Sequence, residues 1–304
     1  MATALPLRPK VSAHTRNRSR AGMLFALPTA LVVGVFFVVP LGLLVWMSFN
    51  DWPLIGASRP NGLTDYEAVT DPLFTRAITF TIVWTVLSTA VLLVVSLALA
   101  LLVQEARRGV GVFRTLFLLP VAVGMAAATL MFYSFFMDPD SPLNGALTVL
   151  GIGPVDWIGT RDHVIASTLL LVTWRFAGFY MLILLTGLQA IPAPLYEAAR
   201  VDGAGAWTTF KSVTLPLLRP SLSLTLLLSV TGGLLSFEQF FIMTAGGPDN
   251  STVTLVLAVY RQAFTLFDLG RAAAMSVVLL IVLLGLNTGQ FVLMRRGAED
   301  QRHL

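Results

Sequence analysis

The sequence predicts an all-α integral membrane protein with six transmembrane helices in one bundle. Three observations lead to this fold class. Of the 304 residues, 56% are hydrophobic and only 12% are charged, and the mean hydropathy is +0.80, values far from those of soluble domains. Six apolar runs each reach the roughly 20 residues that a helix needs to cross a bilayer. Basic residues gather in alternate segments between these runs.

The six apolar runs define the predicted domain organisation. The spans are predicted at about residues 22–47, 77–103, 113–137, 164–188, 217–243 and 272–294. The first run follows a basic tail but is much longer than the apolar region of a cleaved signal peptide, so we expect it to remain as a span. Residues 1–20 and 295–304 are then tails, and residues 21–294 form a single membrane domain.

The distribution of basic residues predicts the orientation. Fourteen of the 20 Lys and Arg residues lie in the two tails, in the connector after the second span and in the loop 189–220. Five lie in the three alternate loops, and Arg175 lies within the fourth span. Because cytoplasmic segments carry the excess of Lys and Arg, we expect both termini and the loop 189–220 to face the cytoplasm.

The residue inventory excludes several classes of function. The chain has no Cys, and His14, His163 and His303 lie far apart, so a Cys-ligated metal or a thiolate nucleophile is excluded and metal catalysis is not expected. Neither Lys10 nor Lys211 follows the glycines of a phosphate-binding loop, so the chain itself should not hydrolyse ATP. The net charge of +4 reports orientation and gives no reason to expect nucleic-acid binding. No catalytic motif points to an enzyme.

The cytoplasmic loop 189–220 differs from the flanking spans because it carries charges, Ala, Gly and Pro. Pro192 and Pro194 end the preceding span, and residues 195–202 can form about two helical turns closed by Gly203. The Leu215-Pro216 pair then starts the next span. We therefore expect a rigid elbow with a short helix that docks on another protein, the alternative being a plain polar connector.

This loop resembles the EAA loop of ABC importer permeases, in which Glu-Ala-Ala is followed by Gly and then by Leu-Pro. The match falls on Glu197, Ala198, Ala199, Asp202, Gly203, Ala204, Leu215 and Pro216. The resemblance implies a permease bundle whose cytoplasmic coupling helix enters a cleft of an ATPase subunit. It also implies two such ATPase subunits, which bind ATP and Mg²⁺, so no cofactor is expected on this chain.

A second resemblance concerns the segment after the fifth span. The run Thr244-Ala245-Gly246-Gly247-Pro248, with Tyr260, Phe264 and the approach from Gly270 to Ala274, is similar to sugar-type ABC permeases of the maltose, lactose and glycerol-phosphate group. It resembles the first of two non-identical permeases in these systems. The resemblance implies a second permease, an extracytoplasmic solute-binding protein and a place in the inner or plasma membrane of a prokaryote.

Two charges inside predicted spans, Arg175 and Glu238, mark the interior of the bundle. An ionisable group in hydrocarbon costs roughly 2.5–3.5 kcal/mol on insertion scales, so each should face the interior and find a partner. Their side chains are long enough to reach one another, which allows a purely structural ion pair as the alternative to a solute path. The predicted path consists of Arg175, Phe179, Tyr180, Phe237, Glu238, Gln239 and Phe240, with Trp174 nearby.

The sequence thus predicts the permease subunit of an ATP-driven importer for a sugar or related carbohydrate. One alternative is the same kind of importer for another solute, such as a polyamine or an amino acid. Another is an autonomous channel or ion-coupled carrier that uses Arg175 and Glu238 as its ion site. An intramembrane enzyme would have only these two residues as a catalytic pair.

Overall fold

The computed structural model describes residues 25–105, 109–138 and 140–300. Within this part of the chain, five helices are long and apolar enough to cross a membrane: Phe25–Met47, Pro72–Leu102, Arg161–Gln189, Arg219–Thr244 and Leu269–Val292. A bent helix pair between the second and third of these makes a sixth span if it is counted as one. The predicted helical membrane fold is therefore confirmed, and five predicted spans correspond to single observed ones.

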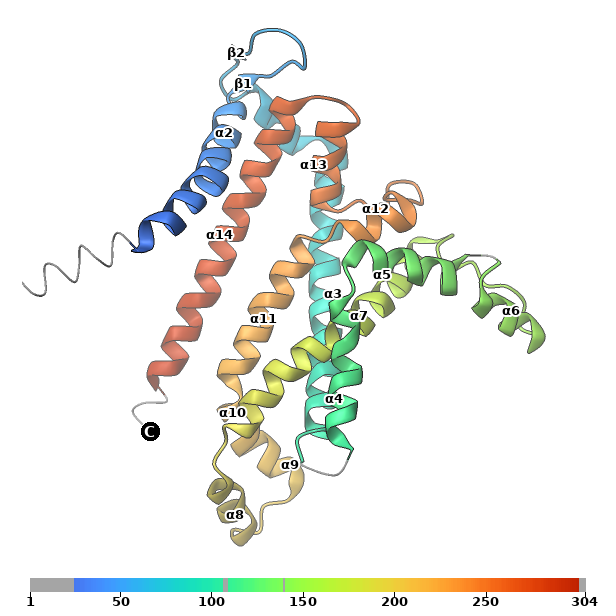
Figure 1. Cartoon of the computed structure of the whole chain (residues 1–304), viewed down its shortest axis with the longest axis vertical. Helices are drawn as coiled ribbons and strands as arrows, with labels where there is room; N and C mark the ends of the chain where they lie inside the picture. The colour runs from blue at the N-terminus through green and yellow to red at the C-terminus, as the bar shows by residue number, and fades with distance from the viewer. Residues whose placement is uncertain (1–24, 106–108, 139, 301–304) are drawn as a thin grey trace, which may run out of the picture.

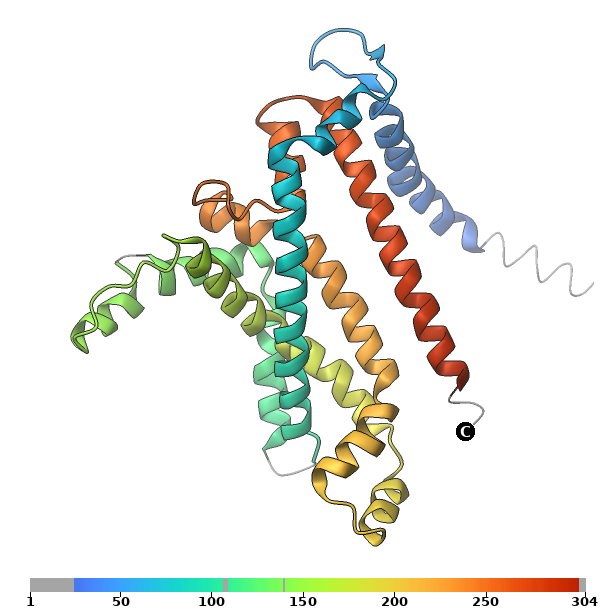
Figure 2. The same cartoon turned by 180° about the vertical axis from the view of Figure 1, so that it is seen from behind.

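The centre of the bundle is built from three helices, α3 (Pro72–Leu102), α7 (Arg161–Gln189) and α11 (Arg219–Leu234), which pack against one another. The long helix α14 (Leu269–Asp300) covers α11 on one side, as Figure 1 and the reverse view in Figure 2 show. Local chemistry fixes where two of these helices begin. The Asp71 carboxylate accepts a hydrogen bond from the backbone of Leu73, and Thr160 caps α7 in the same way.

The main core lies in the half of the bundle that the sequence predicts to face outward, which we call the outer half, and aromatic side chains from different helices meet there. Trp84 and Phe240 are fully buried, and their rings are 4.9 Å apart in an edge-to-face arrangement. Phe80 completes the cluster at 5.2 Å from Phe240. A short apolar helix, α13 (Leu255–Phe264), seals this end, and the backbone N–H of Leu255 donates to the Thr81 hydroxyl.

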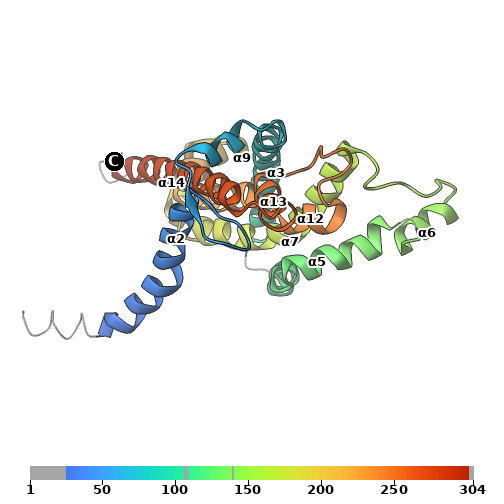
Figure 3. The ribbon, with the colours of Figure 1, turned by 90° about the horizontal axis from the view of Figure 1, so that it is seen from above.

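The first span stands away from the bundle. It runs through a π-helical segment, η1 (Gly34–Val38), into α2 (Val39–Met47), and no residue of its most apolar stretch is buried within this chain. In Figures 1 and 3 it leans away from the bundle, and α2 packs against α14. A helix that is apolar and exposed all round requires lipid or another protein around it.

The outer end of the molecule carries a small antiparallel hairpin, β1 (Asn50–Asp51) with β2 (Arg59–Pro60). Asn50 pairs with Pro60, and Asp51 pairs with Arg59. A 3₁₀ segment, η2 (Thr64–Thr70), follows and leads directly into α3. This hairpin and η2 pack against the start of α14 and join the first span to the rest of the outer surface.

The predicted third span, residues 113–137, corresponds to a bent pair of helices rather than to one continuous helix. The structure has α4 (Val110–Leu118) with η3 (Leu119–Ala122), then a bend of 99° into α5 (Met125–Phe132), η4 (Tyr133–Met137) and α6 (Pro142–Val149). The physical reason lies in the sequence at the bend. Pro120 lacks a backbone N–H, and Gly124 takes an extended conformation with ψ 146°, so the helix cannot continue.

Candidate functional site

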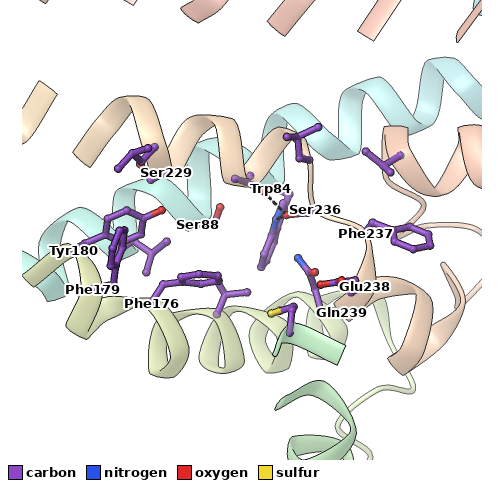
Figure 4. Close-up of a pocket in the computed structure, with 18 residues that line it drawn as sticks. Trp84, Ser88, Phe176, Phe179, Tyr180, Ser229, Ser236, Phe237, Glu238 and Gln239 are labelled. Atoms are coloured by element: carbon purple, nitrogen blue, oxygen red, sulfur yellow. Dashed lines mark hydrogen bonds between the residues drawn. The ribbon is translucent and has the colours of Figure 1, made fainter. Parts of the chain in front are cut away.

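A cavity of about 580 Å³ lies in the middle of the bundle, between α3, α7 and the interrupted fifth span. We call it the central cavity. Figure 4 shows aromatic rings from α7 facing the serines of α3 and α11 across it. Its lining consists of Trp84, Ser88, Leu92, Met125, Val172, Phe176, Phe179, Tyr180, Leu228, Ser229, Gly232, Gly233, Leu235, Ser236, Phe237, Glu238, Gln239 and Val256.

The cavity exists because the fifth span is broken. Helix α11 ends at Leu234, and a second helix, α12 (Glu238–Thr244), begins only after three non-helical residues. A Cβ on Gly233 would lie about 3.0 Å from Thr85, so the absence of a side chain lets α11 approach α3 closely just before the break. Ser236 fixes the break itself, since its hydroxyl accepts a 2.8 Å hydrogen bond from the Trp84 indole N–H.

The break places polar groups at the depth of the membrane interior. Glu238 and Gln239 begin α12 and line the cavity together with the hydroxyls of Ser88, Ser229 and Tyr180. Glu238 is the one carboxylate among these lining residues, and no cationic residue lines the cavity. Five aromatic side chains complete the lining: Trp84, Phe176, Phe179, Tyr180 and Phe237.

Such a lining matches the chemistry of a carbohydrate. Sugar hydroxyls need hydrogen-bond donors and acceptors, while the C–H faces of a sugar ring stack on aromatic rings. Non-helical backbone at membrane depth is tolerated where it lines a cavity, and that is its position here. Within the described residues no group of His, Cys, Asp or Glu side chains is placed to hold a metal ion.

The structure brings together five of the seven residues predicted for the solute path. Phe179, Tyr180, Phe237, Glu238 and Gln239 all line the central cavity. Phe240 does not line it, because its ring is 0% exposed and packs in the aromatic core. Trp174, also considered for the path, is half-exposed and packs near Phe132 on another face of α7.

Arg175, the seventh of these residues, is buried, with 8% of its surface exposed, but its partners are other groups than Glu238. Its guanidinium donates to the backbone carbonyl of Val121 at 3.2 Å and lies 4.8 Å from the Phe176 ring centroid. In the described part of the chain it forms no ion pair with Glu238 within 4.0 Å, so the structure does not show the ion pair that the sequence allowed as an alternative to a solute path. The bend after η3 explains this, because it presents free carbonyl groups to α7.

Several cavity residues were not predicted from the sequence. Trp84 and Ser88 lie in the middle of α3, and Ser229 and Ser236 lie in or just after α11, all within runs interpreted only as lipid-crossing. One available indication was the spacing of polar residues in α3. Thr81, Thr85, Ser88, Thr89 and Ser96 are buried and recur at helical intervals, which marks an inward-facing stripe.

The loop that was predicted to be cytoplasmic folds into a two-part elbow, which we define as residues 193–217. Helix α8 (Ala193–Val201) leads to Gly203, whose φ of +72° is the left-handed conformation that glycine favours. The elbow returns through α9 (Ala206–Thr209), η5 (Phe210–Thr214) and α10 (Leu215–Leu217) into α11. The hydroxyls of Tyr196 and Thr214 are 3.2 Å apart and tie the two parts together.

The elbow projects beyond the ends of the spans, at the opposite end of the molecule from the hairpin, as Figures 1 and 2 show. It presents apolar side chains at its surface. Val201 is 87% exposed and Trp207 is 74% exposed. Glu197, Ala198, Asp202 and Gly203 are exposed as well, whereas Ala199 and Ala204 are half-buried. The short helix and its closing glycine thus lie where the sequence predicted them.

Comparisons with known proteins agree with this arrangement. The trehalose/maltose transport system permease protein MalF of Thermococcus litoralis is 32% identical over 282 residues, covering 90% of this chain and 95% of that protein. The arabinooligosaccharides transport system permease protein AraP of Bacillus subtilis is 32% identical over 271 residues (88% and 86%). The lactose transport system permease protein LacF of Rhizobium radiobacter is 30% identical over 278 residues (89% and 92%).

The fold is also that of a solved transporter. A chain of a bacterial ABC transporter involved in the import of the acidic polysaccharide alginate superposes with a TM-score of 0.79 at 22% identity, covering 92% of this chain and 98% of that one. The family model described as binding-protein-dependent transport system inner membrane component matches residues 75–296. This protein is therefore a multi-pass membrane protein of the family of inner membrane components of binding-protein-dependent transport systems.

Proposed function

We propose that this chain is a permease subunit of an ABC importer that moves a carbohydrate across the membrane. The observation that supports this most directly is the central cavity, where five aromatic rings face hydroxyls, an amide and the Glu238 carboxylate behind a broken helix. Relatives of similar length that carry names of trehalose/maltose, arabinooligosaccharide and lactose systems favour a sugar over a polyamine or an amino acid.

The elbow supplies the mechanical part of the mechanism. In this proposal α8 enters a cleft of a cytoplasmic ATPase, and two such subunits approach one another when they bind ATP and Mg²⁺. Residues Glu197 to Ala204 make the contact, and the displacement passes through Leu215-Pro216 in α10 to α11. The tilt of α7 and α11 opens the central cavity alternately to either side of the membrane. This chain itself binds no cofactor.

A second, non-identical permease completes the path. The first span supports this part of the proposal, because its most apolar stretch is wholly unburied within this chain while the rest of the bundle is packed. On the outer side, a solute-binding protein delivers the sugar. The chain sits in the inner or plasma membrane of a prokaryote, with both termini in the cytoplasm.

Reconstitution into liposomes tests the proposal. The vesicles contain this chain, the second permease and both ATPase subunits, with the solute-binding protein outside, and the uptake of radiolabelled maltose, lactose and an arabino-oligosaccharide is measured. We expect uptake of at least one sugar that requires ATP inside and stops when any component is omitted. Solute movement by this chain alone, without an ATPase, would replace the importer with an autonomous carrier.

A further inference from the structure

A second pocket, of about 330 Å³, opens on the outer surface, apart from the central cavity. We call it the outer pocket. The first turns of α3, the start of α7 and the loop after α12 form it. Its lining consists of Thr75, Arg76, Thr79, Phe80, Arg161, Asp249, Asn250 and Ser251. No residue lines both the outer pocket and the central cavity.

The two arginines of the outer pocket differ from their neighbours on the same surface. Arg271 pairs with Asp268 at 3.5 Å, and Arg261 donates to the Asn250 side chain at 2.7 Å and to the carbonyl of Ala245. Arg76 and Arg161 are exposed and, in the described part of the chain, have neither an ion pair nor a side-chain hydrogen bond. Arg161 lies 5.8 Å from the centroid of the Phe80 ring, which leaves its N–H groups free to bind a ligand.

The positions of these arginines are unfavourable for the protein on its own. Arg161 is the first residue of α7 and Arg76 lies in the second turn of α3, so both positive charges are near the positive end of a helix dipole. Arginine is also depleted in the outer loops of membrane proteins. Apart from the contact of Arg161 with the Phe80 ring, neither side chain has an ion pair or a hydrogen bond within the described chain, so both guanidinium groups are available to another molecule.

The chemistry of the outer pocket selects an anion of small size. Two guanidinium groups offer planar pairs of N–H donors that match a carboxylate, and Thr75 and Thr79 add hydroxyls. Asp249 also lines the pocket, but the two arginines outnumber it. A sugar ring is poorly served, since Phe80 is the only aromatic residue in the lining and Arg161 lies over it.

We propose that Arg76 and Arg161 form a socket for a carboxylate side chain of the solute-binding protein that docks on the outer face. This inference rests on the proposed function, which requires such a partner. It adds the site on this chain and the chemistry of the contact. A solved alginate transporter of the same fold, with a TM-score of 0.79 at 21% identity, is described in complex with an alginate pentasaccharide-bound periplasmic protein, so a transporter of this fold does bind such a partner.

The test measures docking directly. The complete transporter is placed in lipid nanodiscs, and the affinity of its own fluorescently labelled solute-binding protein is measured over a range of salt concentrations. The double variant R76Q/R161Q should bind about tenfold more weakly or worse at low salt, and its affinity should depend less on salt than that of the wild type. Arg59→Gln is the matched control, because Arg59 is an exposed outer arginine on β2 outside the pocket and should leave both quantities unchanged.

Further arms separate the possible outcomes. The double variant R76K/R161K keeps the charge but loses the forked donors, so an intermediate affinity supports the socket and shows that the site is intact. Equal affinity and equal salt dependence for wild type and R76Q/R161Q would overturn the socket while leaving the importer in place. Failure of the wild-type complex to bind its solute-binding protein would instead count against the proposed function. Competition by free glucuronate with wild type but not with R76Q/R161Q would assign the pocket to acidic sugars and also overturn the docking role.

Discussion

Glu238 begins α12 at the point where the fifth span is interrupted, and its carboxylate faces the central cavity. Because Arg175 binds the Val121 carbonyl instead, the charge of Glu238 is not neutralised by a partner within 4.0 Å in the described chain. Glu238 is exposed to the cavity rather than buried, so its carboxylate can accept hydrogen bonds from water or from a bound solute. A sugar hydroxyl is a suitable donor, so the residue favours a hydroxyl-rich solute.

Replacement of Glu238 by Gln or Ala tests this role. A hydrogen bond to a charged group contributes about 1.5–3 kcal/mol, so Glu238→Ala should lower the apparent affinity of uptake roughly ten- to hundredfold, and Glu238→Gln less. The measurement is the concentration dependence of sugar uptake by the reconstituted transporter. Glu67→Gln, an exposed acid in η2, is the control and should have no effect. Loss of complex assembly with Glu238→Ala would assign the residue a structural role instead.

Asp65, in η2 on the outer surface, provides a prediction about pH. Burial raises the pKa of its carboxyl above the ordinary 3.8. A hydrogen bond from Asn61 lowers the pKa by a smaller amount, and the negative charges of Asp268 and Asp51 raise it further. A carboxyl whose pKa is raised by folding stabilises the fold fully below its unfolded pKa and loses that contribution as pH rises through its folded pKa. Ionised Asp65 therefore destabilises the outer surface at neutral pH.

Asp65→Asn removes this ionisation with little change of shape. We expect the melting temperature of the detergent-solubilised protein to rise at neutral pH and the difference from wild type to shrink as pH falls toward 3.8. Thermal unfolding at a series of pH values gives the measurement. A difference that stays the same across the series would show that the titration of Asp65 does not contribute.

Helix α8 depends on the residue that closes it. Gly203 has a φ of +72°, where a β-branched side chain is strained by roughly 1–2 kcal/mol or more, so Gly203→Val should distort the end of the docking helix. Membrane insertion should be normal, while sugar uptake falls severalfold and ATP hydrolysis becomes uncoupled from it. Gly205→Ala is the matched control, since Gly205 has a φ of −70° and open space around it. Full transport by Gly203→Val would count strongly against the docking role.

The packing of α7 against α4 depends on another glycine. A Cβ on Gly178 would lie 1.8 Å from the carbonyl oxygen of Phe117, so even Ala forces the two helices apart. Overpacking of this kind costs about 1–3 kcal/mol, and Gly178→Ala should lower the melting temperature in detergent. Gly285→Ala in α14, where nothing lies within 4 Å, should leave it unchanged or raise it slightly. A Gly178→Ala variant as stable as wild type would mean that the helices separate without cost.

For the whole molecule, hydropathy predicted the membrane class and most spans, because lipid imposes a simple length and polarity on each helix. It did not predict the bend at Pro120 and Gly124, since the apolar run continues unbroken through both residues. Nor did it identify the cavity-lining residues of α3. Single serines and tryptophans in an apolar helix are common, and their direction becomes clear only when neighbouring helices are in place.

We expect the elbow to bind the ATPase. Photocrosslinking in the assembled complex tests whether the two lie close together. A photocrosslinker at Ala199 should capture a nucleotide-hydrolysing subunit in working transporters, and the yield should change when ATP is bound. The products are identified by mass spectrometry. A crosslinker at Ala57, in the hairpin on the opposite side of the membrane, is the control. If the Ala199 probe never captures an ATPase in an active complex, the coupling role of α8 is wrong.

The exposed apolar side chains of the elbow have a consequence for how a cell must make this protein. Val201 and Trp207 are largely exposed when the chain is alone, and the most apolar stretch of the first span is unburied within the described chain. A copy without partners therefore exposes apolar surface at the elbow and along the first span. Such surfaces bind chaperones, proteases and other unassembled copies. Balanced synthesis of every subunit is then a requirement of the structure, and surplus copies should be short-lived.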